Sequence, residues 1–104
     1  MTTGTGNLDI QEKLRRRFQE RLSLALPVLR AHKLAAMDPV PQDLVLLVHG
    51  LAGAGGTFGF PTVSTAAMAL ENHFRHDDNP HTVLAALDEL ILVIDGILSE
   101  DAQT

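Results

Sequence analysis

A single histidine, His49, stands in a strongly apolar stretch of this 104-residue chain and is followed by glycines. The stretch is "LVLLVHGLAGAGGTFGF", residues 44–60, and it places five glycines within the ten residues after His49. A neutral imidazole carries a nitrogen lone pair that can act as a nucleophile. Glycines beside it would remove side chains from its surroundings. The pattern indicates a nucleophilic histidine with a cleared approach, or else an ordinary surface histidine.

Helical spacing decides which side of the helix His49 occupies. On a wheel of about 100° per residue, His49 lies about 140° from Leu44, and the apolar residues that share the side of Leu44 are the predicted core. We therefore expect the imidazole to face solvent. The residues expected on the same outer face are Leu46, Gly53, Gly56 and Phe60.

The glycines of this stretch lower helix stability. Each costs roughly 0.5–1 kcal/mol relative to alanine inside a helix, so Gly50, Gly53 and Gly56 need a reason to be there. Close helix packing can justify a glycine on the core side. Gly53 and Gly56 lie one and two turns beyond His49 on its own side, where they would let another molecule reach the ring.

A second group of polar side chains lies in "HFRHDDNPH", residues 73–81. Imidazoles and carboxylates at such spacing can hold Zn²⁺ or Ni²⁺. The alternative is a solvated helix end, where histidine also suits the negative end of the helix dipole. The residues in question are His73, His76, Asp77, Asp78 and His81.

Composition excludes several other classes of protein. The chain has no cysteine and a formal net charge of −5, and its one basic cluster is "KLRRR", residues 13–17. That cluster could steer an acidic partner or form a solvated face, but the chain lacks the broad basic surface that nucleic-acid binding needs. No apolar run is long enough to span a membrane, and the stretch "MTTGTGNLDIQEK", residues 1–13, has no apolar core of the secretory kind. We expect a cytoplasmic protein, without a phosphate-binding loop for ATP.

Four amphipathic segments must position these residues. The apolar stripes indicate helices from Leu8 to about Ala36, from Pro41 to about Gly56, from Pro61 to about Arg75, and from Pro80 onward, with Asn79 as an N-cap. Pro27 predicts a kink or break in the first. Short connections favour antiparallel neighbours, so the predicted fold is all-α, an up-down-up-down four-helix bundle with an N-terminal helical extension. Residues 1–7 are expected to be a flexible tail and residues 8–104 one domain.

The segment from His49 to Glu71 resembles the signature of histidine-containing phosphotransfer (HPt) domains. In that family His-x-Leu-Lys-Gly is followed by a second glycine and an apolar helix that ends in Leu-Glu. The first helical region also looks like the family's preceding helix. The matching residues are His49, Leu51, Gly53, Gly59, Leu70 and Glu71.

The resemblance implies a phosphorelay intermediate without a cofactor or kinase activity of its own. His49 would accept a phosphoryl group from the phosphoaspartate of one receiver domain, which supplies Mg²⁺, and pass it to another. We expect a monomer. The implied docking residues are Val45, Leu46, Ala52, Gly53, Gly56 and Phe60.

One position departs from the family pattern. The family's lysine three residues after the histidine is Ala52 here. This departure leaves a second interpretation open, a pseudo-phosphotransfer bundle that docks on receivers or kinases without carrying phosphate.

Overall fold

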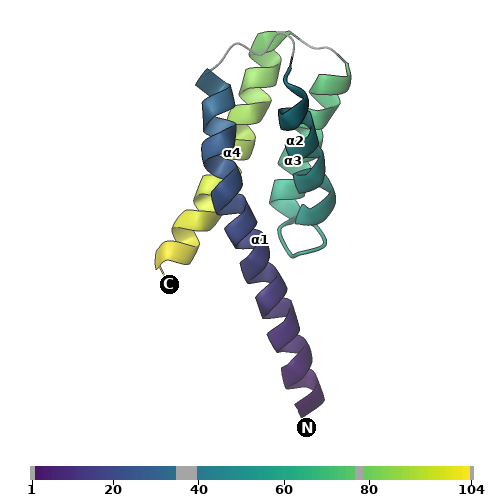
Figure 1. Cartoon of the computed structure of the whole chain (residues 1–104), viewed down its shortest axis with the longest axis vertical. Coiled ribbons are helices and arrows are strands. Elements are labelled where there is room, and N and C mark those ends of the chain that lie inside the picture. Colours follow the sequence, from purple (N-terminus) through teal and green to yellow (C-terminus); the bar gives the residue numbers. More distant parts are fainter. Residues whose placement is uncertain (1, 35–39, 77–78, 104) are drawn as a thin grey trace.

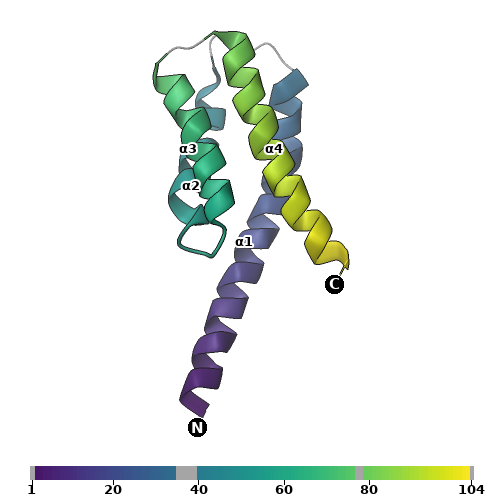
Figure 2. The ribbon, with the colours of Figure 1, turned by 180° about the vertical axis from the view of Figure 1, so that it is seen from behind.

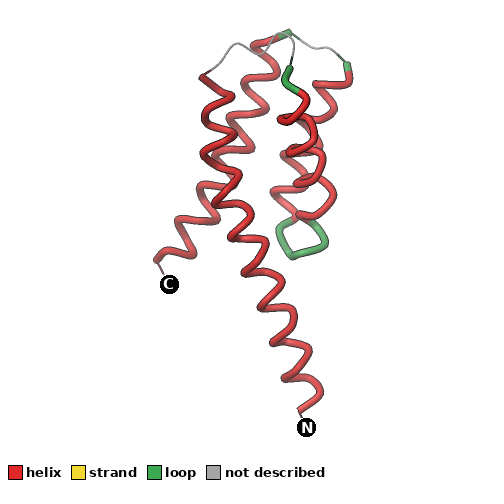
Figure 3. Tube along the Cα trace, in the orientation of Figure 1, coloured by secondary structure: helices red, strands yellow, loops and turns green. Residues whose placement is uncertain are grey.

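The computed structural model describes residues 2–34, 40–76 and 79–103, and these residues form helices and turns with no strand. The helices are α1 (Thr2–Leu34), α2 (Gln42–Gly55), α3 (Pro61–Arg75) and α4 (Pro80–Gln103). Consecutive helices run in opposite directions (Figure 1), and the tube trace shows the loop that joins α2 to α3 (Figure 3). The predicted all-α, up-down-up-down bundle is confirmed.

Proline and asparagine set the helix starts close to where the sequence indicates. α3 begins at Pro61 and α4 at Pro80. The side-chain oxygen of Asn79 accepts a hydrogen bond from the backbone N–H of Thr82 at 3.0 Å, which caps α4 as predicted. Pro41 is the N-cap of α2, so the helix begins at Gln42, one residue after the predicted start.

The core is aliphatic and runs the length of the bundle. α2 packs against α3, α3 against α4, and α4 against α1, so that α2 and α1 close the ring (Figure 2). Burying one leucine or isoleucine side chain stabilises a fold by about 1.5–3 kcal/mol. The largest fully buried side chains come from all four helices, as the apolar stripes predict, and are Leu22, Leu29, Leu44, Leu51, Leu70, Leu87, Leu90 and Ile94.

Helix α1 begins earlier than the sequence indicates, and of the two outcomes predicted at Pro27 it excludes the break. It begins at Thr2, so residues 2–7, expected as a tail, are helical, whereas Met1 lies outside the described residues. It also continues through Pro27 without a break. Ser23 and Pro27 are both exposed, so the carbonyl that loses its partner amide can face water. Leu22, Leu26 and Leu29 hold both halves of the helix on the core.

The N-terminal half of α1 projects from the bundle (Figure 1). The molecule measures 55 Å along its longest axis, and its radius of gyration is 15.2 Å, whereas a compact chain of this length would have about 13 Å. Leu14 is 40% exposed because it lies on this projection, and Ile10 is 58% exposed. The predicted N-terminal helical extension is therefore present. We call residues 10–21 of α1 the arm.

Candidate functional site

His49 lies in the middle of α2 and on its exposed side. Leu44, Val48, Leu51 and Gly55 of the same helix are buried, whereas the His49 side chain is 67% exposed. Its place on the helix agrees with the wheel. The ring is thus held on a rigid helix and remains open to solvent.

A carboxylate from the neighbouring helix contacts the ring. Nδ1 of His49 is hydrogen-bonded to Oε2 of Glu71, whose side chain is only 14% exposed. An ionised carboxylate can only accept hydrogen bonds. Nδ1 therefore carries the proton of the neutral ring, and Nε2 carries the lone pair. Arg75, one turn further along α3, places Nη2 3.7 Å from the same Glu71 oxygen.

Sequence reasoning did not assign Glu71 a role in the site. The contact joins residues 22 positions apart on two helices, and periodicity within one helix does not say which exposed residues of different helices meet. The available signal was its position after the buried Leu70, in the Leu-Glu pair that matches the HPt signature.

The backbones of α2 and α3 approach closely beyond the histidine. The Ser64 hydroxyl donates to the carbonyl oxygen of Ala52 at 2.6 Å. A Cβ on Gly55 would lie 2.8 Å from the backbone nitrogen of Ser64, so only glycine fits there without a shift. These contacts fix α2 against α3 and hold the positions of His49 and Glu71 relative to each other.

Most residues predicted around His49 form one continuous surface. A Cβ on Gly53 or Gly56 would meet nothing within 4 Å, so both glycines face open space. Leu46 is 62% exposed, and Val45 and Ala52 are half-buried. We call this set the docking face, and its members are Val45, Leu46, His49, Ala52, Gly53 and Gly56.

Met68 on α3 borders the docking face, and sequence reasoning missed it. It is exposed, and its sulfur lies 3.7 Å from the hydroxyl of Ser64, which in turn bonds Ala52. Met68 is one turn before Glu71 on the same helix. A flexible thioether at this position adds an adaptable apolar contact to the surface.

Phe60 is not part of the docking face, and its assignment there was wrong. It is only 5% exposed. α2 ends at Gly55, and the chain then reverses through Gly59 at φ 88°, a conformation that favours glycine. The wheel does not apply beyond the helix end. The Phe60 ring stacks on Phe18 with centroids 5.5 Å apart.

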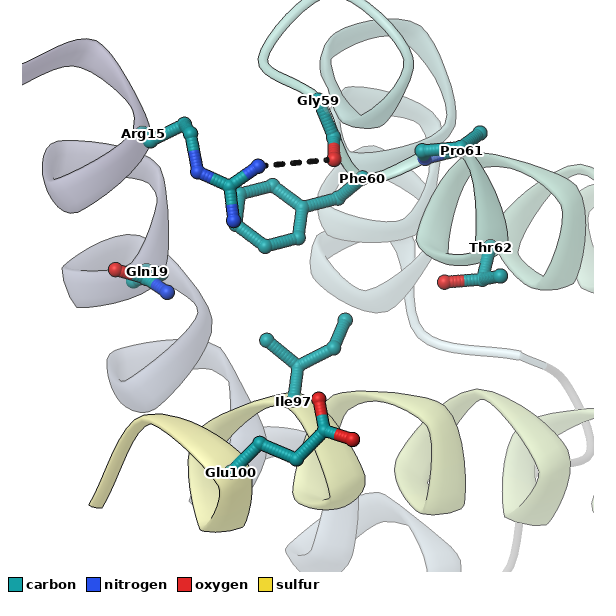
Figure 4. A pocket seen from close by; sticks show the side chains of 8 residues that line it. All are labelled: Arg15, Gln19, Gly59, Phe60, Pro61, Thr62, Ile97 and Glu100. Carbon is teal, nitrogen blue, oxygen red and sulfur yellow. Dashed lines mark hydrogen bonds between the residues drawn. The ribbon is translucent and has the colours of Figure 1, made fainter. Parts of the chain in front are cut away.

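The other side of this loop borders a pocket of about 340 Å³ between α1, α4 and the start of α3 (Figure 4). The guanidinium of Arg15 lies 4.6 Å from the centroid of the Phe60 ring and donates to the Gly59 carbonyl at 3.4 Å. Arg15 thereby fastens α1 to the loop. The pocket is lined by Arg15, Gln19, Gly59, Phe60, Pro61, Thr62, Ile97 and Glu100.

The histidines near the end of α3 do not form a metal site with other described residues. No three potential ligands gather anywhere in residues 2–34, 40–76 and 79–103. Nδ1 of His76 lies 2.9 Å from the carbonyl oxygen of Asn72 in its own helix. Asp77 and Asp78 lie outside the described residues.

Within the described part of the chain, no helix combines the length and the apolar character needed to cross a membrane.

Comparison with known proteins agrees with this geometry. The family model of the Hpt domain matches residues 9–100. The chain belongs to the Hpt domain family, whose members are phosphocarrier modules rather than kinases, and this membership supports a phosphotransfer role in two-component signalling. Neither the curated proteins nor the solved structures give a match.

Proposed function

We propose that His49 is the phosphorylated residue of a phosphorelay intermediate. It accepts a phosphoryl group from the phosphoaspartate of one receiver domain and yields it to the aspartate of another. The observation that carries this proposal is an exposed imidazole on a rigid helix whose Nδ1 is bonded to Glu71. Family membership over residues 9–100 supports the same reaction class.

The hydrogen bond determines which nitrogen reacts. The lone pair of Nε2 attacks phosphorus, the N–P bond forms, and the P–O bond to the aspartyl carboxylate breaks with its electrons leaving on that carboxylate. Nδ1 keeps its proton and donates a hydrogen bond to Glu71 throughout. The carboxylate therefore stabilises the positive charge that develops on the ring. The return step to a second receiver reverses the same bonds.

In such a reaction this chain supplies few catalytic groups beyond the nucleophile. Phosphoryl transfer depends mainly on positioning and on neutralising charge. We expect the receiver domain to bring Mg²⁺, as the family resemblance implies. The part of this chain is to hold the nucleophile and to present an uncluttered surface, because Gly53 and Gly56 add no side chain beside the ring.

The docking face supplies the apolar contact for a receiver. Leu46 on α2 and Met68 on α3 are large, exposed apolar side chains near His49. Val45 and Ala52 add smaller half-buried contacts. We propose that one receiver at a time covers this surface, that the chain acts as a monomer, and that it works in the cytoplasm, where it would meet receivers.

A second candidate function is docking without phosphate transfer. The feature that favours it is Ala52, which places no cation one turn from His49. The pairing of His49 with Glu71 favours phosphotransfer, since a bundle that only docks has no need for an oriented imidazole.

The test is direct transfer of label. The purified chain is mixed with a panel of receiver domains carrying labelled phosphoaspartate, and label on the chain is followed over time. Wild type should acquire label from at least one receiver, and His49→Gln should acquire none. His81→Gln, an exposed histidine at the start of α4, is the matched control and should behave as wild type. Label on His49→Gln would place the nucleophile elsewhere.

A further inference from the structure

One side of the arm carries cations and apolar side chains together. On a wheel of about 100° per residue, its members fall within about 100° of one another, and Glu12 and Glu20 fall outside this range. All of them are exposed. We call this the arm face, and it consists of Ile10, Lys13, Leu14, Arg17 and Arg21.

The arm face continues from the docking face. Arg21 reaches across to α2, where its Nη2 would lie 2.6 Å from a Cβ on Gly50, the residue next to His49. Its guanidinium also lies 5.8 Å from the centroid of the Phe18 ring. From this point the arm runs past the loop between α2 and α3 and away from the bundle (Figure 1).

Cations in the two halves of α1 have different surroundings. Towards the C-terminal end, Arg30 pairs with Asp95 at 3.3 Å and Lys33 with Asp88 at 2.5 Å, both on α4. In the described part of the chain, no carboxylate forms an ion pair with Lys13, Arg17 or Arg21. The acidic helix α4 therefore balances one end of α1, and the arm face keeps its positive charge.

We propose that the arm face is a second docking element for the receiver domain that binds at His49. It binds a part of the receiver surface that carries carboxylates between apolar side chains, adjacent to the receiver's phosphorylated aspartate. This inference rests on the proposed function. Charge selects the occupant, since three exposed cations without an ion-pair partner among the described residues favour an acidic surface, and Ile10 and Leu14 add apolar contact that a purely electrostatic encounter would not need.

The test compares two adjacent arginines on different sides of α1. Arg17 belongs to the arm face, whereas Arg16 points to another side and pairs weakly with Glu12 at 3.9 Å. Arg17→Glu and Arg16→Glu change the net charge equally. The probe is the unphosphorylated receiver domain that accepts label fastest from the wild-type chain, and its Kd is measured by calorimetry at about 50 mM and 300 mM salt.

We expect Arg17→Glu to raise Kd about tenfold at the lower salt concentration and about threefold or less at the higher one, because salt screens exposed charges. Arg16→Glu should change Kd less than twofold. Ile10→Ser should raise Kd severalfold with little dependence on salt. Equal Kd values for the two arginine variants would overturn the proposal.

Failure of this inference is distinguishable from failure of the proposed function. If no receiver exchanges label with the wild-type chain, the phosphorelay itself is wrong. If exchange occurs and Arg17→Glu transfers label at the wild-type rate with saturating receiver, the site at His49 is intact. The Kd values then test the arm face alone. Concentration-dependent dimerisation of the wild-type chain, abolished by Arg17→Glu, would instead show that the arm face binds a second copy, and would overturn the assignment to the receiver.

Discussion

Glu71 should determine both the tautomer and the reactivity of His49. The perturbation is Glu71→Ala, which removes the acceptor of the Nδ1–H bond and leaves the ring free to rotate and to carry its proton on Nε2. A ring protonated on Nε2 has no lone pair there and cannot attack phosphorus through that nitrogen. In the variant, a smaller fraction of the His49 rings should carry the lone pair on Nε2, so phosphoryl transfer should be slower.

The size of the effect follows from the exposure of the two partners. A hydrogen bond to a charged group contributes about 1.5–3 kcal/mol. The imidazole is 67% exposed although the carboxylate is 14% exposed, so a value at or just below the lower end is appropriate. About 1.4 kcal/mol corresponds to a tenfold change in rate. We expect Glu71→Ala to slow phosphoryl transfer about tenfold, and Glu71→Gln, which keeps a neutral acceptor, about threefold.

The assay is single-turnover transfer from a labelled receiver at saturating concentration, so that affinity does not enter. Glu89→Ala removes an exposed carboxylate from α4 and is the control. Nitrogen NMR of the ring gives an independent readout, since Glu71→Ala should shift protonation from Nδ1 towards Nε2, and mere loosening of the fold would not. Transfer by Glu71→Ala within twofold of wild type, with an unchanged tautomer, would refute the role of Glu71.

Two further predictions concern the glycines of α2. Gly53→Leu should raise the free energy of unfolding by about 0.5–1 kcal/mol, because leucine favours helix and the position is open. It should nevertheless slow phosphoryl transfer by obstructing the docking face. Denaturation and label exchange measure the two effects, and a more stable variant with unchanged transfer would contradict this prediction. Gly55→Ala should lower the free energy of unfolding by at least about 1 kcal/mol, since its Cβ would meet the backbone of Ser64 at 2.8 Å and of Phe60 at 3.0 Å, and Gly53→Ala, which should stabilise, is its matched control in the same denaturation series.

The fold could be predicted from local rules because its determinants are local. Pro61 and Pro80 begin helices through the fixed backbone angle of proline, and Asn79 caps α4 through its side-chain oxygen. The spacing of leucines selects the buried side of each helix. The exposed position of His49 followed from the same spacing. Phe60 was misplaced because the reversal at Gly59 lies beyond the helix, where spacing along a wheel has no meaning.

The part of the site that could not be predicted consists of contacts between helices. Glu71 and Arg21 approach the neighbourhood of His49 from α3 and α1. Their contacts near His49 could not be foreseen from the pattern within either helix, because the relative rotation of packed helices depends on the whole core. The helical pattern therefore indicated His49 as the candidate nucleophile, and the packing was needed to find the residues around it.

The glycines near His49 separate into two groups once their neighbours are known. Gly55 is explained by close packing against the backbone of α3, whereas a Cβ on Gly50 would meet only the end of the flexible Arg21 side chain, which can move aside. A methyl group on Gly53 or Gly56 would touch no neighbour. Gly56 is the C-cap of α2 and lies in the turn, so the cost of a glycine inside a helix does not apply to it. Folding gives no reason for Gly53, which costs up to about 1 kcal/mol of helix stability and lies one turn from the exposed imidazole. Its cost is best explained by a partner surface that must approach His49 closely, and a surface histidine without a function would not require it.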